Sequence, residues 1–151
     1  MDHRFYMEEA LAEAKEAFNL GEIPVGAVIV DKGQIIARAC NRREAWADPT
    51  AHAEIIALRE AARVRGSWRL SGVTLYVTLE PCPMCAGALV QARVSRLVYG
   101  APDIRGGAVD SVINIVENPH FNHKVEVIPG IYEEECRELM KSFFKKLRRD
   151  G

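Results

Sequence analysis

The sequence lacks an excess of either charge. Its 20 Lys and Arg nearly balance 21 Asp and Glu, giving a formal net charge of −1. This balance excludes binding of nucleic acid through bulk positive charge, although it leaves room for a local basic patch. Apolar residues make up 48% of the 151 residues and charged residues 27%, which is typical of a globular protein and not of a disordered one. The length fits one domain, and we expect residues 1–151 to form a single unit.

Long apolar runs are also lacking. Segments such as Val25–Val30 are far shorter than the roughly 20 residues that cross a membrane. The first residues lead directly into an acidic helical pattern without the apolar core of a signal peptide, so we expect no membrane association and a cytoplasmic protein. Cysteines are few, and a reducing compartment makes them a poor disulfide framework. The close pair Cys82 and Cys85 indicates a metal or redox site, whereas Cys40 and Cys136 are interpreted as small core residues.

Apolar periodicity predicts strands alternating with helices. We expect helices over about residues 7–18, 51–64, 83–93 and 131–149, and strands over 24–30, 34–41, 73–79, 97–99 and 125–128. The first two strands form a probable hairpin, and the irregular residues 101–124 are long enough to be a functional loop. This alternation predicts an α/β fold in which a central, mostly parallel sheet of about five strands is covered on both faces.

The segment Cys82-Pro83-Met84-Cys85 follows a predicted strand and opens a predicted helix. Thiols three residues apart in a first helical turn project to the same side, and the helix dipole favours their ionised form. Taken alone, this motif fits a dithiol redox site, half of a structural zinc site or inert packing. The motif by itself leaves these three interpretations open.

A second constellation, His52-Ala53-Glu54, is expected in the first turn of the helix over 51–64. Side chains in a first turn lean toward the N-terminus and can reach over the helix end. His52, Cys82 and Cys85 would then provide three zinc ligands and leave a fourth position for water, the arrangement of a catalytic site. Zinc lowers the pKa of such a water to about 7. Glu54 is left beside it as a proton carrier, so the hypothesis is hydrolytic chemistry.

The pattern His-x-Glu followed by Pro-Cys-x-x-Cys is the signature of zinc-dependent base deaminases. Nearly the whole chain resembles the bacterial tRNA-specific adenosine deaminases, a branch of the zinc-dependent cytidine/deoxycytidylate deaminase family. The segments that carry the resemblance are residues 24–27, 48–54, 74–82, 84–87, 121–123 and 143–144.

This resemblance implies a three-layer α/β/α cytidine-deaminase-like fold, a homodimer, and conversion of adenosine to inosine at the wobble position of the tRNA anticodon. It implies that one Zn²⁺ per subunit is bound by His52, Cys82 and Cys85, with Glu54 as the proton shuttle. It also implies a set of residues that contact the RNA. Val25 would pack on the target base, while the flipped nucleotide and its neighbours would be held by Asn41, Asp103 and Asn122.

The last predicted helix is acidic at its start and basic at its end. Compensation of the helix dipole explains this distribution, but cations beside the pair Phe143-Phe144 also suit RNA, since cations bind phosphates and rings stack on bases. We therefore expect Phe143 and Phe144 to contact substrate, with packing on the sheet as the alternative. A second basic group is interpreted as a solvated face and comprises Arg59, Arg63, Arg65 and Arg69.

Three other functions compete with tRNA deamination. A deaminase of free bases or nucleotides, of guanine or cytosine type, would carry the same zinc signature. A non-catalytic, zinc-stabilised RNA-binding module would have no use for Glu54 beside an open ligand position. A dithiol redox protein would leave His52 without a role.

Overall fold

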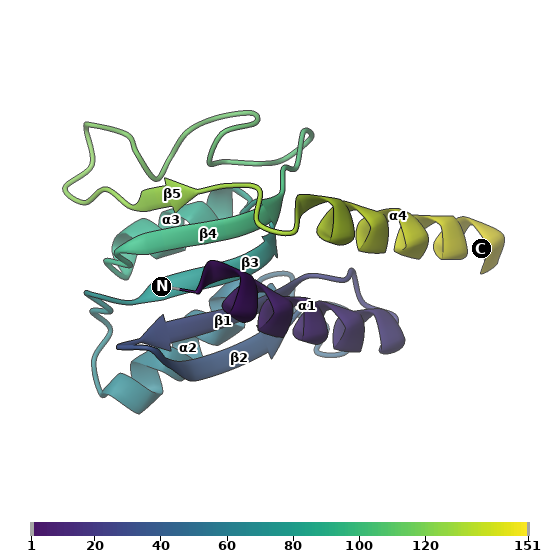
Figure 1. Cartoon of the computed structure of the whole chain (residues 1–151), viewed down its shortest axis with the longest axis horizontal. Helices are drawn as coiled ribbons and strands as arrows, with labels where there is room; N and C mark the ends of the chain where they lie inside the picture. Colours follow the sequence, from purple (N-terminus) through teal and green to yellow (C-terminus); the bar gives the residue numbers. More distant parts are fainter. Residues whose placement is uncertain (1, 151) are drawn as a thin grey trace.

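The computed structural model describes residues 2–150. This part of the chain contains five strands and four helices. Their order and bounds are α1 (His3–Asn19), β1 (Gly26–Asp31), β2 (Gln34–Cys40), α2 (Ala53–Arg65), β3 (Thr74–Leu79), α3 (Pro83–Gln91), β4 (Arg96–Ala101), β5 (Glu126–Ile128) and α4 (Glu133–Asp150). The strands form one sheet with α1 and α4 on one face and α2 and α3 on the other (Figure 1). This is the expected three-layer α/β/α fold.

The sheet is mixed, with the strand order β2-β1-β3-β4-β5. β3, β4 and β5 run parallel, whereas β1 is antiparallel to both of its neighbours. β2 and β3, which are connected through α2, run in the same direction as expected, because each is antiparallel to β1. The hairpin places β1 between them, so two of the four pairings are antiparallel and the sheet is less parallel than predicted.

Alternating side chains of the strands enter two apolar clusters, one on each face of the sheet. Ile29, Leu75 and Leu97 belong to the cluster on the side of α2 and α3. Their neighbours on the strands, such as Val28 and Val98, belong to the cluster beside α1 and α4. Burial of each large apolar side chain contributes about 1.5–3 kcal/mol. The two clusters therefore hold the helices firmly on the sheet that carries the site.

Helix α4 approaches β4 at a residue without a side chain. A Cβ atom at Gly100 would overlap the Sγ of Cys136 and lie 2.8 Å from the carbonyl oxygen of Thr78. Cys136 and Cys40 are each only 2% exposed, so the structure agrees with their interpretation as small core residues. Beyond this contact, α4 continues past the end of the sheet (Figure 1).

The remaining differences from prediction concern element ends. Helix α2 begins at Ala53, two residues later than expected, because His52 has extended backbone angles and acts as the N-cap residue. The irregular segment covers residues 102–125 where 101–124 was predicted, because Ala101 belongs to β4 and β5 begins at Glu126. Among residues 2–150, no helix combines the length and apolar character that crossing a membrane requires.

Candidate active site

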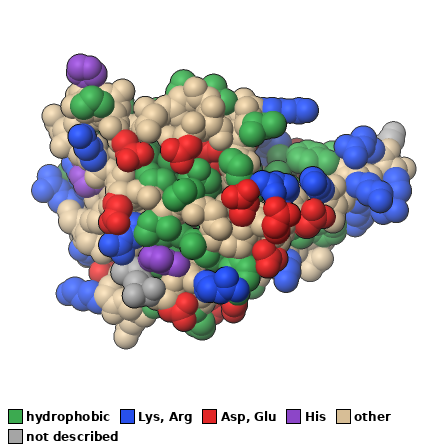
Figure 2. Space-filling view, turned by 45° about the horizontal axis from the view of Figure 1, so that its top comes forward, with side chains coloured by type: hydrophobic (Ala, Val, Ile, Leu, Met, Phe, Trp, Pro, Cys, Tyr) green, Lys and Arg blue, Asp and Glu red, His purple; other side chains and the backbone are tan. Residues whose placement is uncertain are grey.

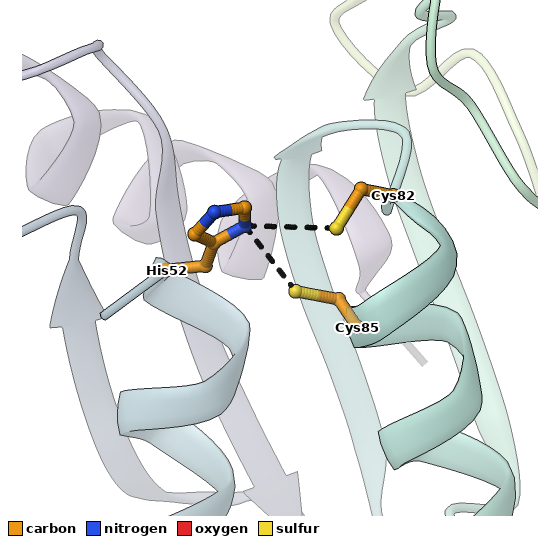
Figure 3. A group of neighbouring side chains, drawn as sticks. All are labelled: His52, Cys82 and Cys85. Carbon is orange, nitrogen blue, oxygen red and sulfur yellow. Dashed lines mark hydrogen bonds between the residues drawn. The ribbon is translucent and has the colours of Figure 1, made fainter. Parts of the chain in front are cut away.

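Two helix N-termini bring three potential metal ligands together. His52 is the N-cap residue of α2, Cys82 is the N-cap residue of α3, and Cys85 lies in the first turn of α3. Pro83 starts α3 directly after Cys82, at the helix position where its fixed φ angle and missing N–H are tolerated. The imidazole of His52 faces both sulfur atoms across the gap between the helices (Figure 3).

The spacing of these donor atoms fits a zinc ion. The Nδ1 atom of His52 lies 3.7 Å from Sγ of Cys82 and 3.5 Å from Sγ of Cys85, and the three atoms lie within 4.8 Å of one another. A nitrogen and a sulfur bound to one tetrahedral zinc ion would be about 3.6 Å apart. Imidazole and thiolate are also the ligands that zinc prefers. The set therefore supplies three of the four ligands of a tetrahedral site.

The two thiols differ in their readiness to ionise. A hydrogen bond from Cys85, together with one from His52, lowers the pKa of Cys82 to about 4. The same hydrogen bond to Cys82, followed by burial, raises the pKa of Cys85 above its ordinary value. The hydrogen bond to Cys82 also raises the pKa of His52. Cys82 is therefore a thiolate near neutral pH, which is the form that binds a metal.

Glu54 is a buried carboxyl group beside these ligands. It lies in the first turn of α2, is 4% exposed, and lines the same cleft as His52 and Cys82. Burial raises its pKa to about 7. A group with such a pKa can both accept and release a proton near neutral pH, which general acid–base catalysis requires.

A cleft of about 1000 Å³ extends from these residues to α4. Its walls carry many cations, and the complete set is Arg43, Arg105, Arg137, Lys141, Lys145 and Arg148. Arg137 is paired with Glu133 at 2.5 Å, whereas Lys145 and Arg148 have no acidic partner within residues 2–150. Figure 2 shows Lys and Arg gathered toward the end of α4, beyond its acidic start. The outer part of the cleft is thus suited to a polyanion.

Four of the residues expected to contact substrate line this cleft: Val25, Asn41, Asp103 and Phe144. Asn41 is 6% exposed, its backbone N–H donates to the carbonyl of Val25 at 3.1 Å, and its Oδ1 accepts from the backbone N–H of Arg43 at 2.9 Å. The Asn41 amide is therefore held in place at the wall of the cleft. Asp103 lies on the opposite loop.

The other two expected contact residues lie elsewhere. Phe143 is 8% exposed and packs edge-on against Phe18 of α1, with ring centroids 5.9 Å apart. Asn122 is exposed in the irregular segment 102–125. Within residues 2–150, it is not among the residues that line the cleft. For Phe143 the structure shows the packing alternative, whereas its neighbour Phe144 faces the cleft.

Sequence reasoning did not single out several residues that shape the site. Arg43 and Arg105 line the cleft from irregular loops, where an isolated cation carries no periodic signal. Two buried carboxylates were also missed. Glu22 accepts hydrogen bonds from the backbone N–H groups of Glu44 and Ala45, at 3.0 and 2.7 Å. Glu80, at the end of β3, is 2% exposed; a charged residue directly after an apolar strand is the one sequence signal for it.

Comparison with known proteins agrees with this geometry. A model of the MafB19-like deaminase family matches residues 1–148. A tRNA-specific adenosine deaminase of Bacillus subtilis is 51% identical over 144 residues, which cover 95% of this chain and 89% of the relative. One of Aquifex aeolicus is 49% identical over 150 residues, covering 98% and 97%. The chain belongs to the family of tRNA-specific adenosine deaminases.

Solved structures place the fold in the same family. A structure from a study of A-to-I editing by tRNA:A34 deaminases at the wobble position of transfer RNA has a TM-score of 0.86 and 47% identity, covering 89% of this chain and 98% of that chain. A guanine deaminase from Nitrosomonas europaea has a TM-score of 0.81 at 24% identity, covering 93% and 83%. The latter shows the shared fold alone. The expected cytidine-deaminase-like fold of the tRNA-specific adenosine deaminases is thus confirmed.

Proposed function

We propose that this chain converts adenosine to inosine at the wobble position of a tRNA anticodon, consuming water and releasing ammonia. The observation that carries the proposal is the triad of His52, Cys82 and Cys85 with Glu54 in the same cleft. Membership of the tRNA-specific adenosine deaminase family supports the substrate. An anticodon loop also offers the unstacked bases that such a cleft needs, since a base inside a duplex cannot enter it.

We assign one zinc ion per chain to His52, Cys82 and Cys85, because the donor atoms and their spacing suit that metal. When bound, the ion would supply Lewis-acid chemistry that lowers the pKa of a water ligand to about 7. Cys82 is already ionised at neutral pH. The ligand atoms of Cys85 and His52 must carry no proton when the metal is bound, so the affinity for zinc depends on pH.

Glu54 is the proposed proton carrier. Its carboxylate accepts one proton from the attacking water and passes it to N1 of adenine. It then takes the second proton from the same oxygen, now bonded to C6, and delivers it to the amino group, so that the C6–N bond breaks, C6 becomes a carbonyl and ammonia leaves. A pKa of about 7 suits both directions of transfer, because neither form of the group is strongly favoured. Burial also keeps bulk water from competing for the proton.

The target nucleotide would be held from both walls of the cleft. Val25 packs on the base, Asn41 and Asp103 hydrogen-bond the flipped nucleotide, and Phe144 stacks on a neighbouring base. Asn122 would meet RNA outside the cleft, and Phe143 supports Phe144 by packing α4 on α1. Cations on α4 bind phosphates of the anticodon arm.

Three broader features belong to the same proposal. Residues 1–151 act as a single deaminase domain, although residues 1 and 151 lie outside the described part of the structure. The enzyme works as a homodimer in the cytoplasm, where tRNA is available. Each subunit carries its own zinc site.

The decisive experiment incubates the purified protein with an anticodon stem-loop RNA that carries adenosine at the wobble position. Inosine and ammonia should form in equal amounts, and an RNA with guanosine at that position should remain unchanged. Parallel reactions contain free guanine, cytosine or their nucleotides. Deamination of those compounds in the absence of reaction with RNA would replace the proposal by a free-base deaminase, and absence of any reaction in a zinc-loaded protein would contradict both.

A further inference from the structure

Glu80 occupies the junction between the metal-binding motif and the loop that forms one wall of the cleft. It follows β3 and precedes the proposed zinc ligand Cys82 by two positions, with only Pro81 between them. Its side chain is 2% exposed and accepts hydrogen bonds from the segment 102–111. This buried carboxylate is not used by the proposed proton transfers.

The carboxylate is surrounded by hydrogen-bond donors of that segment. Its Oε1 atom accepts from the backbone N–H of Asp103 at 3.0 Å and from the hydroxyl of Ser111. Its Oε2 atom accepts from the backbone N–H groups of Val109, Asp110 and Ser111, at 3.1, 2.7 and 2.9 Å. Hydrogen bonds to an ionised acceptor are shorter and stronger than neutral ones. Both ends of the loop are therefore tied to one side chain.

The loop backbone passes so close to this carboxylate that a side chain would not fit. A Cβ atom at Gly107 would overlap the carboxylate of Glu80. Next to it, the N–H of Ala108 donates to the carbonyl of Pro81 at 2.8 Å. The loop is thus fixed both to Glu80 and to the residue that follows it in the metal-binding motif.

The same loop presents residues to the cleft. Pro102 to Gly106 line it, opposite Val25 and Asn41, and this stretch has neither helix nor strand to fix its position. One end of the stretch is held through Asp103, and the chain beyond its other end through Val109 to Ser111. A displacement of about 1 Å in such a wall can lower a rate by roughly 10²-fold.

We propose that Glu80 is a positioning residue that sets the distance between the cleft wall at 102–106 and the reaction centre beside Cys82. The inference rests on the proposed function, because it assigns Glu80 to the placement of the target base in that reaction. Affinity for the rest of the RNA comes from the cations of α4, which Glu80 does not hold. Loss of the carboxylate should therefore affect the chemical step more than RNA binding.

The test is Glu80→Gln, which keeps the size of the side chain. An amide cannot accept hydrogen bonds at both ends, so its NH₂ group must face a loop donor. In single-turnover reactions of the zinc-loaded protein at saturating anticodon stem-loop RNA, we expect the rate constant to fall about 10–100-fold. The Kd for the RNA should stay within about threefold and the zinc content should not change. Hydrogen exchange of the amides at 103 and 109–111 should be faster than in the wild type.

A matched control separates positioning from stability. Val98→Ala removes two buried methyl groups from the opposite face of the sheet and should lower the Tm while leaving the rate constant within about twofold. Ser111→Ala removes one donor to Glu80 and should lower the rate in the same sense as Glu80→Gln, by about two- to fivefold. Gly107→Ala displaces the loop while Glu80 is intact, which keeps the inference testable if Glu80→Gln does not fold.

Several results would overturn the inference. A folded Glu80→Gln protein with the wild-type rate constant would do so. An equal loss of rate in Val98→Ala, or hydrogen-exchange rates in Glu80→Gln equal to those of the wild type, would also do so. Failure of the proposed function is recognised separately, because then the wild-type protein itself forms no inosine. The exchange measurement needs no substrate and compares loop order in either case.

Discussion

At the inner end of the cleft, four reactive side chains lie on two helix N-termini packed against the sheet, and the carboxyl of Glu54 is almost completely buried. At the outer end, cations of α4 stand in solvent on a helix that runs past the sheet (Figure 1). At the inner end, burial raises the pKa of Glu54, and hydrogen bonds from Cys85 and His52 lower the pKa of Cys82, whereas the cations at the outer end are exposed. The difference indicates that chemistry and RNA affinity can be changed independently.

The largest effect should come from removing a ligand at the inner end. Cys82→Ala should lose its zinc and all measurable deamination. If zinc is present at about 1,000 times its Kd, loss of binding should lower the free energy of unfolding by about 4 kcal/mol. Metal analysis and thermal unfolding check both effects. Cys136→Ala, which removes a buried thiol from the other face of the sheet, serves as control and should keep its zinc; full zinc content in Cys82→Ala would refute the ligand assignment.

Glu54→Gln should separate chemistry from binding within the inner end itself. The amide has nearly the same shape but cannot carry a proton, and general acid–base catalysis is worth about 10²–10⁴-fold. Because Glu54 is proposed to act at more than one step, we expect a loss of at least about 10⁴-fold in the single-turnover rate. Zinc content and the Kd for RNA should remain close to the wild-type values. Near-normal inosine formation by the zinc-loaded variant would falsify the proton-carrier role.

Changes at the outer end should have the converse pattern. Replacement of Lys141, Lys145 and Arg148 by Gln should weaken binding of the anticodon stem-loop about 10–100-fold at low salt. The slope of log K against log salt should become shallower by about 2–3, while the rate at saturating RNA stays within about twofold. Arg59→Gln with Arg63→Gln, on the basic face of α2, is the matched control. If both sets weaken binding equally, the outer end has no special role.

The smallest effect on RNA should come from two neighbouring rings. Phe144→Ala should weaken RNA binding by about 1 kcal/mol, the lower end for loss of one stacked base, and leave the Tm nearly unchanged. Phe143→Ala should instead lower the free energy of unfolding by about 3 kcal/mol, because its ring is buried against Phe18. Denaturant unfolding and RNA titration of the two variants give a direct comparison. Equal loss of RNA affinity in both would show that Phe143 also contacts substrate.

Local sequence patterns predicted the helices, the strands and the reactive residues, because each of these depends on residues that are close together in the sequence. Strand alternation around Val77 and the spacing of Cys82 and Cys85 need only neighbouring residues. The signature with His52 and Glu54 belongs to a known kind of site, so the triad could be expected before its 3.5 and 3.7 Å distances were seen.

Contacts between distant segments could not be predicted in this way. The antiparallel pairing of β1 with β3 depends on the position of β1 between β2 and β3, the two parallel strands that α2 connects, and no local pattern encodes that position. Glu22 and Glu80 are charged residues that ordinarily lie at the surface, and only the converging backbone N–H groups of distant loops explain their burial. Phe143 and Phe144 are adjacent, so their opposite environments follow from the rotation of α4.

The close packing of α4 on β4 at Gly100 constrains how this chain can change over evolutionary time. The side chain of Cys136 occupies the space that is free because Gly100 has no side chain. A larger residue at either position would therefore push α4 away from the sheet. Because α4 carries most of the cations that line the cleft, such a shift would move them relative to the buried reaction centre. The two positions should therefore vary together among related sequences, with a side chain at position 100 matched by a smaller side chain at position 136.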